Sequence, residues 1–335
     1  MKQYLRKLVS RTDLTQTEMA EAFDFIMSGR SSPAQTGAFL AAMCMKGETI
    51  VEISGAAASM RRHAVFIDTA GLPVVDTCGT GGDSLNTFNI STTAAFVVAG
   101  AGVRVAKHGN RAVTSKCGSA DVLAELGVNL DAKPHVVEDC IRTAGIGFLF
   151  AQSLHPAMKH AGPVRKDLGF RTVFNMLGPL TNPAGARGQI LGVFSAELTE
   201  TFAAVLKELG SKRALVVHGN DGMDEITTTT TTRISELRDG RITTREFDPL
   251  QHVDGYATLA DLAGGDPQVN AAITRNVLAG IKGPHRDIVC LNAAGAIIAG
   301  GRADDFETAV SLARKAIDSG KAMQALEALV KASNT

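Results

Sequence analysis

The chain has 335 residues, enough to bury a substantial core in one large domain or in two ordinary ones. It carries 34 basic and 34 acidic residues, so no net field draws it to nucleic acid or to an anionic membrane, and any phosphate site must be local. No apolar run is long enough to span a bilayer and the first 25 residues lack the apolar core of a signal peptide, so we expect a cytoplasmic protein.

Helices alone are predicted for residues 1–68. Apolar residues recur there at helical spacing, and no strand pattern interrupts them. Ser32 before Pro33 is typical of an N-cap followed by a proline at the first helical position, and Thr49 precedes another apolar-periodic stretch. The amino-terminal part of the chain is therefore expected to be all helical.

Alternating strands and helices are predicted from residue 72 onward. The β-branched run at 72–76 ends in a glycine cluster and begins the alternation. Further strands are predicted at 103–106, 147–150, 189–194 and 214–217. Helices are predicted at 90–100, 119–126, 135–144 and 199–209. This order favours a mostly parallel sheet covered by helices.

The pattern changes after Asp221. Residues 228–237 and 241–247 flank a turn at 238–240 and predict a β-hairpin. The six threonines at 227–232 are expected to belong to a strand rather than to a linker. From Asp266 onward the chain is alanine-rich and predicted to be helical.

A glycine-rich segment, residues 76–83, directly follows the first predicted strand. Its glycines allow the backbone to approach a ligand and to point successive N–H groups at an anion. The spacing matches neither a Walker A loop nor a dinucleotide fingerprint, and such a run is also compatible with a plain tight turn. Residues 89–93 then open an apolar helix with hydroxyls and free N–H groups at its positive end, which favours a phosphate site.

Two later segments carry charged residues of the kinds that bind phosphates and their metal ions. Residues 107–111 place two cations and an amide at the carboxyl end of a predicted strand, and hydroxyls follow at 112–121; a solvated basic turn is the alternative. Asp224 and Glu225 lie in a turn after another strand. Paired carboxylates of this kind are Mg²⁺ ligands in phosphate sites, although such a pair in isolation is usually only solvated.

In this order, these motifs resemble those of the anthranilate phosphoribosyltransferases. The segments that carry the resemblance are 79–83, 89–92, 107–111, 118–121, 155–159, 163–165, 171–180 and 224–225. The similarity extends over essentially the whole chain. Two positions depart from the family's common residues: Thr230 and Thr231 replace a glycine and a proline, and Cys117 replaces a serine. The five cysteines are scattered and indicate reduced thiols rather than disulfides or a zinc site.

The resemblance implies an α/β fold with a small all-helical N-terminal domain and a large α/β domain around a central, mostly parallel sheet, as in the nucleoside phosphorylase and phosphoribosyltransferase fold. It implies a helical domain of residues 1–70, joined by the segment around 165–185, and a phosphoribosyl-binding domain of residues 71–335. It also implies a homodimer formed through the helical part, an active site between the domains, and two Mg²⁺ ions per site.

The resemblance further implies a role for individual residues. The donor, phosphoribosyl pyrophosphate (PRPP), is expected to contact Gly79, Gly82, Asp83, Thr87, Asn89, Ile90, Ser91, Thr92, Lys107, His108, Gly109, Asn110, Arg111, Ala112, Val113, Thr114, Ser115 and Ser119. The acceptor, anthranilate, is expected to contact Gly79, Asn110 and Arg165, with His108 and His155 along its channel. The metal ligands implied are Ser91, Asp224 and Glu225, with Glu225 shared between the ions.

The chemistry expected is transfer of the phosphoribosyl group of PRPP to the amine of anthranilate, which gives N-(5-phosphoribosyl)anthranilate and pyrophosphate in tryptophan biosynthesis. The aromatic amine is already neutral at pH 7, so no covalent nucleophile or strong base is assigned. A pyrimidine nucleoside phosphorylase is one alternative, but its phosphate loop is composed differently from residues 107–111. A nucleic-acid-binding relative is another, and it would be basic and would lack Asp224 and Glu225.

Overall fold

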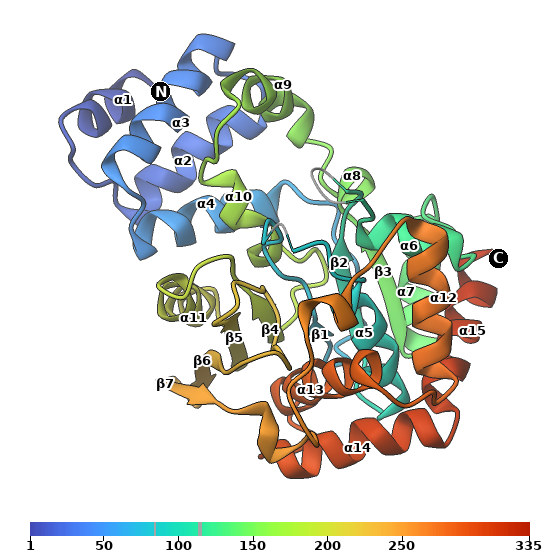
Figure 1. Ribbon diagram of the computed structural model, residues 1–335. Helices are drawn as coiled ribbons and strands as arrows, with labels where there is room; N and C mark the ends of the chain where they lie inside the picture. Colours follow the sequence, from blue (N-terminus) through green and yellow to red (C-terminus); the bar gives the residue numbers. More distant parts are fainter. Residues whose placement is uncertain (84, 113–115) are drawn as a thin grey trace.

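The computed structural model of the chain describes residues 1–83, 85–112 and 116–335. Val113, Thr114 and Ser115, which the sequence assigns to the donor site, lie outside the described residues. Figure 1 shows a helical amino-terminal part beside a larger part built around a sheet.

The amino-terminal part is a bundle of four helices. They are α1 (Lys2–Val9), α2 (Gln16–Met27), α3 (Pro33–Lys46) and α4 (Ile50–Arg62). A capping box begins each of the last three helices. The side chains of Thr15, Ser32 and Thr49 each accept a hydrogen bond from the backbone N–H of the residue three positions later. The side chain of that later residue accepts one from the backbone N–H of the cap residue. The helix starts predicted at Ser32 and Thr49 are thus confirmed.

A later segment of the chain returns to this bundle. Helix α9 (Met158–Leu168) packs against α2 and α3, and α10 (Phe174–Leu177) follows it. The ring of Phe174 lies 5.2 Å from that of Phe23 in α2. Between the bundle and the sheet, the buried guanidinium of Arg61 in α4 donates hydrogen bonds to the carbonyls of Leu180 and Leu209. The two parts are therefore tied together by packing and by a buried cation.

The larger part is built on one sheet of seven strands in the order β3-β2-β1-β4-β5-β6-β7. The strands are β1 (Val75–Asp76), β2 (Val105–Gly109), β3 (Ile146–Phe150), β4 (Gly188–Gly192), β5 (Arg213–Gly219), β6 (Thr232–Arg238) and β7 (Arg241–Phe247). The first five are parallel, and β6 and β7 form an antiparallel hairpin. Positive φ angles at Asp239 and Gly240 suit its two-residue turn. The expected mostly parallel sheet is confirmed.

The threonine run is the main departure from the expected elements. Only Thr232 belongs to β6, and the preceding threonines form a loop. The hydroxyls of Thr227 and Thr229 donate to the carboxylate of Asp221, so local side-chain hydrogen bonds replace strand pairing there. Strand β4 also ends at Gly192, two residues before the predicted end.

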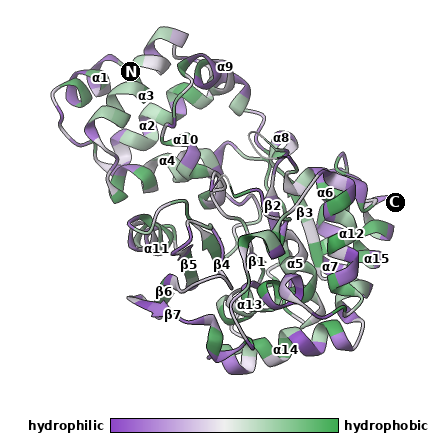
Figure 2. Ribbon diagram, viewed as in Figure 1, coloured by the Kyte–Doolittle hydropathy of each residue, from purple (hydrophilic) through white to green (hydrophobic). Residues whose placement is uncertain are grey.

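Helices cover both faces of the sheet, as Figures 1 and 2 show. They are α5 (Ile90–Gly100), α6 (Ser119–Glu125), α7 (Pro134–Thr143), α8 (Ala151–Leu154), α11 (Leu198–Glu208), α12 (Pro267–Leu278), α13 (Pro284–Ala299), α14 (Phe306–Asp318) and α15 (Lys321–Ser333). Successive residues of β5 point to opposite faces: Leu215 joins the core that contains α5 and α13, and Val216 joins the core shared with the helical bundle. Among the described residues, no helix is both long and apolar enough to cross a membrane.

Candidate active site

Four parallel strands end at the same edge of the sheet and bring the predicted motifs together there. Asp76 ends β1, Gly109 ends β2, Gly192 ends β4 and Gly219 ends β5. Ligands of open α/β sheets bind outside the carboxyl ends of the strands. The glycine-rich segment and the carboxylate pair follow these ends. In the basic segment, residues 107–111, the first three residues belong to β2 itself, which was predicted to end at Ala106.

The glycine-rich segment lies directly against Asp224. The Gly81 N–H donates to Asp224 Oδ2 at 2.7 Å, and a Cβ added to Gly79 would lie 2.8 Å from the same oxygen. Gly81 and Gly82 have φ angles of +65° and +83°, where side chains are strained. The Thr80 N–H donates to the Gly192 carbonyl at 2.8 Å and fixes the segment to the end of β4. The segment therefore has a conformation and a close packing that require glycine, and its approach to a phosphate stays a prediction.

The carboxylates at the floor of the site repel one another. Desolvation, and then the charge of Asp83, raise the pKa of Asp224 to about 7. Desolvation and the charge of Asp224 raise the pKa of Glu225 well above its usual value. The Ser91 N–H, at the start of α5, donates to Glu225 Oε1 at 3.1 Å, where the helix dipole favours an anion. Asp224 and Glu225, next to the start of α5, offer carboxylate oxygens of the kind that Mg²⁺ binds.

Lys107 is the buried cation of the site. Its Nζ lies 3.2 Å from the carbonyl and from the hydroxyl of Thr77, and 3.5 Å from Ser91 Oγ. Its positive charge lowers the pKa of Glu225, and so opposes the larger effects of desolvation and of the Asp224 charge. Lys107 thus places an ammonium group between the start of α5 and the carboxylates.

The rest of the basic segment is folded around Asp121. The Asp121 carboxylate accepts the N–H groups of Ala112 and Gly118 at 2.9 Å each, and it pairs with the Arg111 guanidinium at 2.9 Å. The Asn110 N–H donates to Ser119 Oγ at 3.1 Å. Asn110 is exposed at the edge of the site, whereas Arg111 already has a carboxylate partner.

The remaining predicted donor residues line the entry to α5. The Asn89 amide donates to the Cys117 carbonyl at 3.2 Å, so this residue joins the helix start to the segment before α6. Thr87 pairs in an isolated bridge with Ala263. The side chain of Ile90 is buried in the core, so its predicted contact with the donor would be made by its backbone.

The predicted acceptor residues form two groups. His108 Nδ1 lies 3.1 Å from the Gly178 carbonyl, and His108 Nε2 lies 3.1 Å from His155 Nε2. Arg165 lies in α9 with its guanidinium 5.1 Å from the centre of the Phe174 ring, and burial lowers its pKa. Within the described residues, no hydrogen bond or ion pair joins Arg165 to a carboxylate, to Gly79 or to Asn110.

Two contacts of the site were not predicted. Arg171 donates to the Gly82 carbonyl at 2.9 Å and lies 4.3 Å from the Phe194 ring, so the segment after α9 touches the glycine-rich segment. The buried Asp76 carboxylate accepts from the His108 N–H at 3.1 Å and from the Asn182 amide at 2.7 Å. Burial raises the pKa of Asp76 to about 6. The partners are far apart in sequence, so no local pattern indicated these pairs.

Another group of possible metal ligands comprises Asp76, Cys78 and His108, whose ligand atoms lie within 4.8 Å of one another. Asp76 and His108 already use these atoms in the hydrogen bonds described above. Burial also raises the pKa of the Cys78 thiol and keeps it protonated. The pair Asp224 and Glu225 is therefore the better metal candidate.

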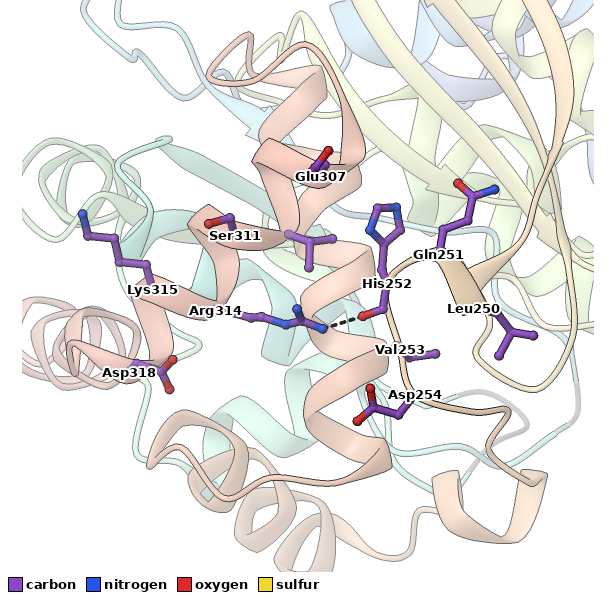
Figure 3. A pocket seen from close by; sticks show the side chains of 11 residues that line it. Leu250, Gln251, His252, Val253, Asp254, Glu307, Ser311, Arg314, Lys315 and Asp318 are labelled. Atoms are coloured by element: carbon purple, nitrogen blue, oxygen red, sulfur yellow. Dashed lines mark hydrogen bonds between the residues drawn. The ribbon is translucent and has the colours of Figure 1, made fainter.

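A groove of about 720 Å³ lies elsewhere, between the chain after β7 and helix α14. Figure 3 shows its lining, in which Arg314 donates to the carbonyl of His252. Arg314 and Lys315 are accompanied there by Asp254, Glu307 and Asp318. This mixture does not concentrate positive charge for a pyrophosphate, so the edge of the sheet remains the candidate active site.

Comparison with known proteins agrees with this fold. The helical bundle domain of the glycosyl transferase family matches residues 2–64, and the a/b domain of that family matches residues 71–323. The anthranilate phosphoribosyltransferase of Syntrophobacter fumaroxidans is 56% identical over 330 residues, which are 98% of each chain.

Solved structures are similar over almost the full length. The crystal structure of the anthranilate phosphoribosyltransferase of Thermus thermophilus has 42% identity and a TM-score of 0.94, covering 99% of each chain. The Saccharomyces cerevisiae enzyme in complex with PRPP and Mg has 29% identity and a TM-score of 0.89, covering 99% of this chain and 97% of that one. The same yeast enzyme has also been solved with 4-fluoroanthranilate.

The fold and the site define a glycosyl transferase with a helical bundle and an α/β part. Within that class, the chain belongs to the anthranilate phosphoribosyltransferase family.

Proposed function

We propose that this protein transfers the phosphoribosyl group of PRPP to the amine of anthranilate and releases pyrophosphate, the second step of tryptophan biosynthesis from chorismate. The observation that carries the proposal is the meeting of the glycine-rich segment, the start of α5, Lys107 and Asp224 at one edge of the sheet. N–H groups, an ammonium group and metal-binding carboxylates are the groups that a diphosphate requires. Membership of the family supports the same substrates.

The donor side of the site acts by electrostatic stabilisation. Lys107 is held in place by Thr77 and faces the position in which negative charge develops on the leaving pyrophosphate. Asp224, Glu225 and the Ser91 hydroxyl would hold Mg²⁺, and we propose two ions per site. When bound, Mg²⁺ neutralises charge on the departing pyrophosphate. The backbone at Gly79 and Gly82 is proposed to contact the ribosyl phosphates, since the Thr80 and Gly81 N–H groups donate to Gly192 and Asp224.

The acceptor side acts by positioning. Arg165 has no carboxylate partner among the described residues and is half-buried, so it is available to bind the carboxylate of anthranilate as a bidentate pair. Asn110 orients the amine. Burial lowers the pKa of His108 to about 3, so this side chain is neutral at pH 7, and its Nε2 already accepts from His155. His108 and His155 therefore line the channel and are not assigned as an acid or a base.

We also propose that the domain boundaries follow the expected division at residues 70 and 71, with the segment around 165–185 joining the helical domain. The packing of α9 against α2 and α3 supports this division. The contact of Arg171 with Gly82 supports a joining segment that lies beside the donor site. The protein is proposed to act in the cytoplasm.

A homodimer through the helical domain is supported by exposed apolar side chains on that domain. Val9 and Met45 are 75% and 77% exposed, and Val51 is 48% exposed. The ends of their helices lie together, because Lys46 pairs with both Asp13 and Glu52. Analytical ultracentrifugation tests this: the parent is expected at twice the chain mass and Met45→Glu at the chain mass.

The function is tested by identifying the products. The purified protein with PRPP, anthranilate and Mg²⁺ is expected to form N-(5-phosphoribosyl)anthranilate and pyrophosphate in equal amounts, measured by mass spectrometry and a pyrophosphate assay. Pyrophosphate release that does not depend on anthranilate contradicts the proposed acceptor.

A further inference from the structure

Asp224 and Glu225 lie in a turn whose two sides are held by buried polar side chains. On the side after the pair, the Ile226 N–H donates to Asn292 Oδ1 at 2.8 Å, and Asn292 Nδ2 donates to the Ile226 carbonyl at 2.9 Å. The amide of Asn292 thus pairs with both polar groups of the residue that follows Glu225. This contact fixes the backbone at the exit of the turn.

Asn292 is unusual for its surroundings. It is 1% exposed and lies in α13, whose residues from Ile288 to Ala299 are all buried and otherwise apolar or glycine. Its second Nδ2 hydrogen donates to the Ile288 carbonyl at 2.9 Å, so the whole amide is satisfied. A buried amide is unfavourable in an apolar core unless it forms hydrogen bonds. Two of the three hydrogen bonds of Asn292 go to Ile226, at the end of the Asp224–Glu225 turn.

On the side before the pair, Asp221 ties the turn to the threonine loop. Its Oδ1 accepts the Met223 N–H at 3.0 Å. Its Oδ2 accepts the hydroxyls of Thr227, at 2.6 Å, and of Thr229. One carboxylate therefore joins the chain immediately before Asp224 to the chain immediately after Ile226.

The turn also packs tightly against the sheet. A Cβ added to Gly192 at the end of β4 would lie 1.5 Å from the Asp224 carbonyl oxygen, so only glycine permits this approach. The turn is therefore held on three sides, by Asn292, by Asp221 and by the end of β4.

We propose that Asn292 and Asp221 are positioning residues that clamp the Asp224–Glu225 turn and set its affinity for a divalent cation. The inference rests on the proposed metal role of Asp224 and Glu225. Neither clamp residue binds the metal; each holds the backbone that presents the ligands. Residues that orient metal ligands typically change metal affinity by about 10- to 100-fold when they are removed.

The test measures metal binding rather than catalysis. Mn²⁺, which accepts the same oxygen ligands as Mg²⁺, is titrated into the protein and the free ion is followed by electron paramagnetic resonance. Asn292→Ala is expected to weaken Mn²⁺ binding by about 10- to 100-fold. Leu291→Ala is the matched control, because Leu291 is equally buried in the same helix and its apolar side chain cannot form a hydrogen bond to the turn. It is expected to lower the melting temperature without changing Mn²⁺ binding.

A second variant tests the other side and serves if Asn292→Ala does not fold. The double change Thr227→Val and Thr229→Val keeps side-chain shape and removes both hydroxyls from Asp221. It is also expected to weaken Mn²⁺ binding. Parent-like Mn²⁺ binding in either folded variant overturns the clamp.

The metal assignment itself is checked separately with Asp224→Asn. Loss of Mn²⁺ binding in Asp224→Asn together with parent-like binding in Asn292→Ala overturns the clamp alone. Mn²⁺ binding that persists in Asp224→Asn overturns the proposed metal site, and the clamp with it.

Discussion

The Nε2 atoms of His108 and His155 lie 3.1 Å apart in a buried pair that holds no positive charge. Because the Gly178 carbonyl can only accept, His108 carries its proton on Nδ1, and its Nε2 accepts the Nε2 proton of His155. His155 Nδ1 is then an unprotonated nitrogen with no hydrogen-bond partner among the described residues. On the proposed anthranilate side of the site, the pair thus presents a ring nitrogen, His155 Nδ1, that can accept a hydrogen bond.

This pair predicts a specific loss of stability in mild acid. Burial lowers the pKa of His108 to about 3 and of His155 to about 4, whereas both titrate near 6.5 in the unfolded chain. As pH falls below about 6.5, the unfolded state binds protons that the folded state does not, so the free energy of unfolding decreases down to the folded pKa values. At pH 5 each histidine is expected to contribute a loss of about 2 kcal/mol.

Urea denaturation at pH 7.5 and pH 5 measures this effect. The His155→Gln variant is expected to lose less stability than the parent between the two pH values, because it has one fewer group to protonate on unfolding. An equal loss in parent and variant means that the pair is charged in the folded protein.

Replacing Arg165 is expected to affect the acceptor and not the donor. Arg165→Ala removes a charge-assisted pair with the anthranilate carboxylate, which raises KM for anthranilate by the equivalent of about 2–3 kcal/mol. The KM for PRPP is expected to change much less. Lys166→Ala, at the exposed neighbouring position, is the control. Steady-state kinetics with an unchanged anthranilate KM in Arg165→Ala would remove the residue from the acceptor site.

Neutralising the carboxylate pair is expected to lower the activity without lowering the stability. Asp224→Asn with Glu225→Gln removes two buried charges whose desolvation raises both pKa values, so the melting temperature is expected to stay unchanged or to rise. Activity is expected to fall, and the Mg²⁺ requirement to move to higher concentration. Calorimetry and a Mg²⁺ titration of the rate measure the two effects. A variant that saturates at the parent's Mg²⁺ concentration shows that other residues hold the metal.

Two glycines with similar backbone conformations allow a matched test of the glycine-rich segment. Gly82 and Gly71 have φ angles of +83° and +75°, so alanine at either position is expected to cost about 1 kcal/mol or more of stability. Only at Gly82 does a Cβ also meet the Arg171 guanidinium, at 2.9 Å, while nothing lies within 4 Å of Gly71.

Calorimetric titration with PRPP and Mg²⁺ then separates the two positions. Gly82→Ala is expected to weaken PRPP binding, and Gly71→Ala is expected to leave it unchanged despite a comparable loss of stability. If folded Gly82→Ala binds PRPP as tightly as the parent, the segment is an ordinary turn.

The parts of the fold that local patterns determine could be predicted from the sequence. Strand β3 and helix α5 follow from hydrophobic periodicity, and the hairpin turn follows from Asp239 and Gly240. Helix α9 was not expected from its residues, because Pro163 interrupts it and its stability comes from packing against α2 and α3. The threonine run was predicted as a strand, but its hydroxyls bond to Asp221 instead.

The site could be predicted where its residues follow strand ends and could not where partners are distant. The glycine-rich segment and Asp224 meet as expected, because parallel strands end at one edge. Arg171 contacts Gly82 across 89 positions, and Asn182 contacts Asp76 across 106. Those pairs depend on how α9 and α10 return to the sheet, which the spacing of residues along the chain does not specify.

The most direct test of the account is the fluorescence of anthranilate in the presence of the purified protein and Mg²⁺. We predict that the fluorescence decreases only when PRPP is added, at a rate proportional to protein concentration, and that the Asp224→Asn, Glu225→Gln variant largely loses this activity. Fluorescence that stays constant with PRPP and saturating Mg²⁺, in a protein shown to be folded, would contradict the proposed phosphoribosyl transfer.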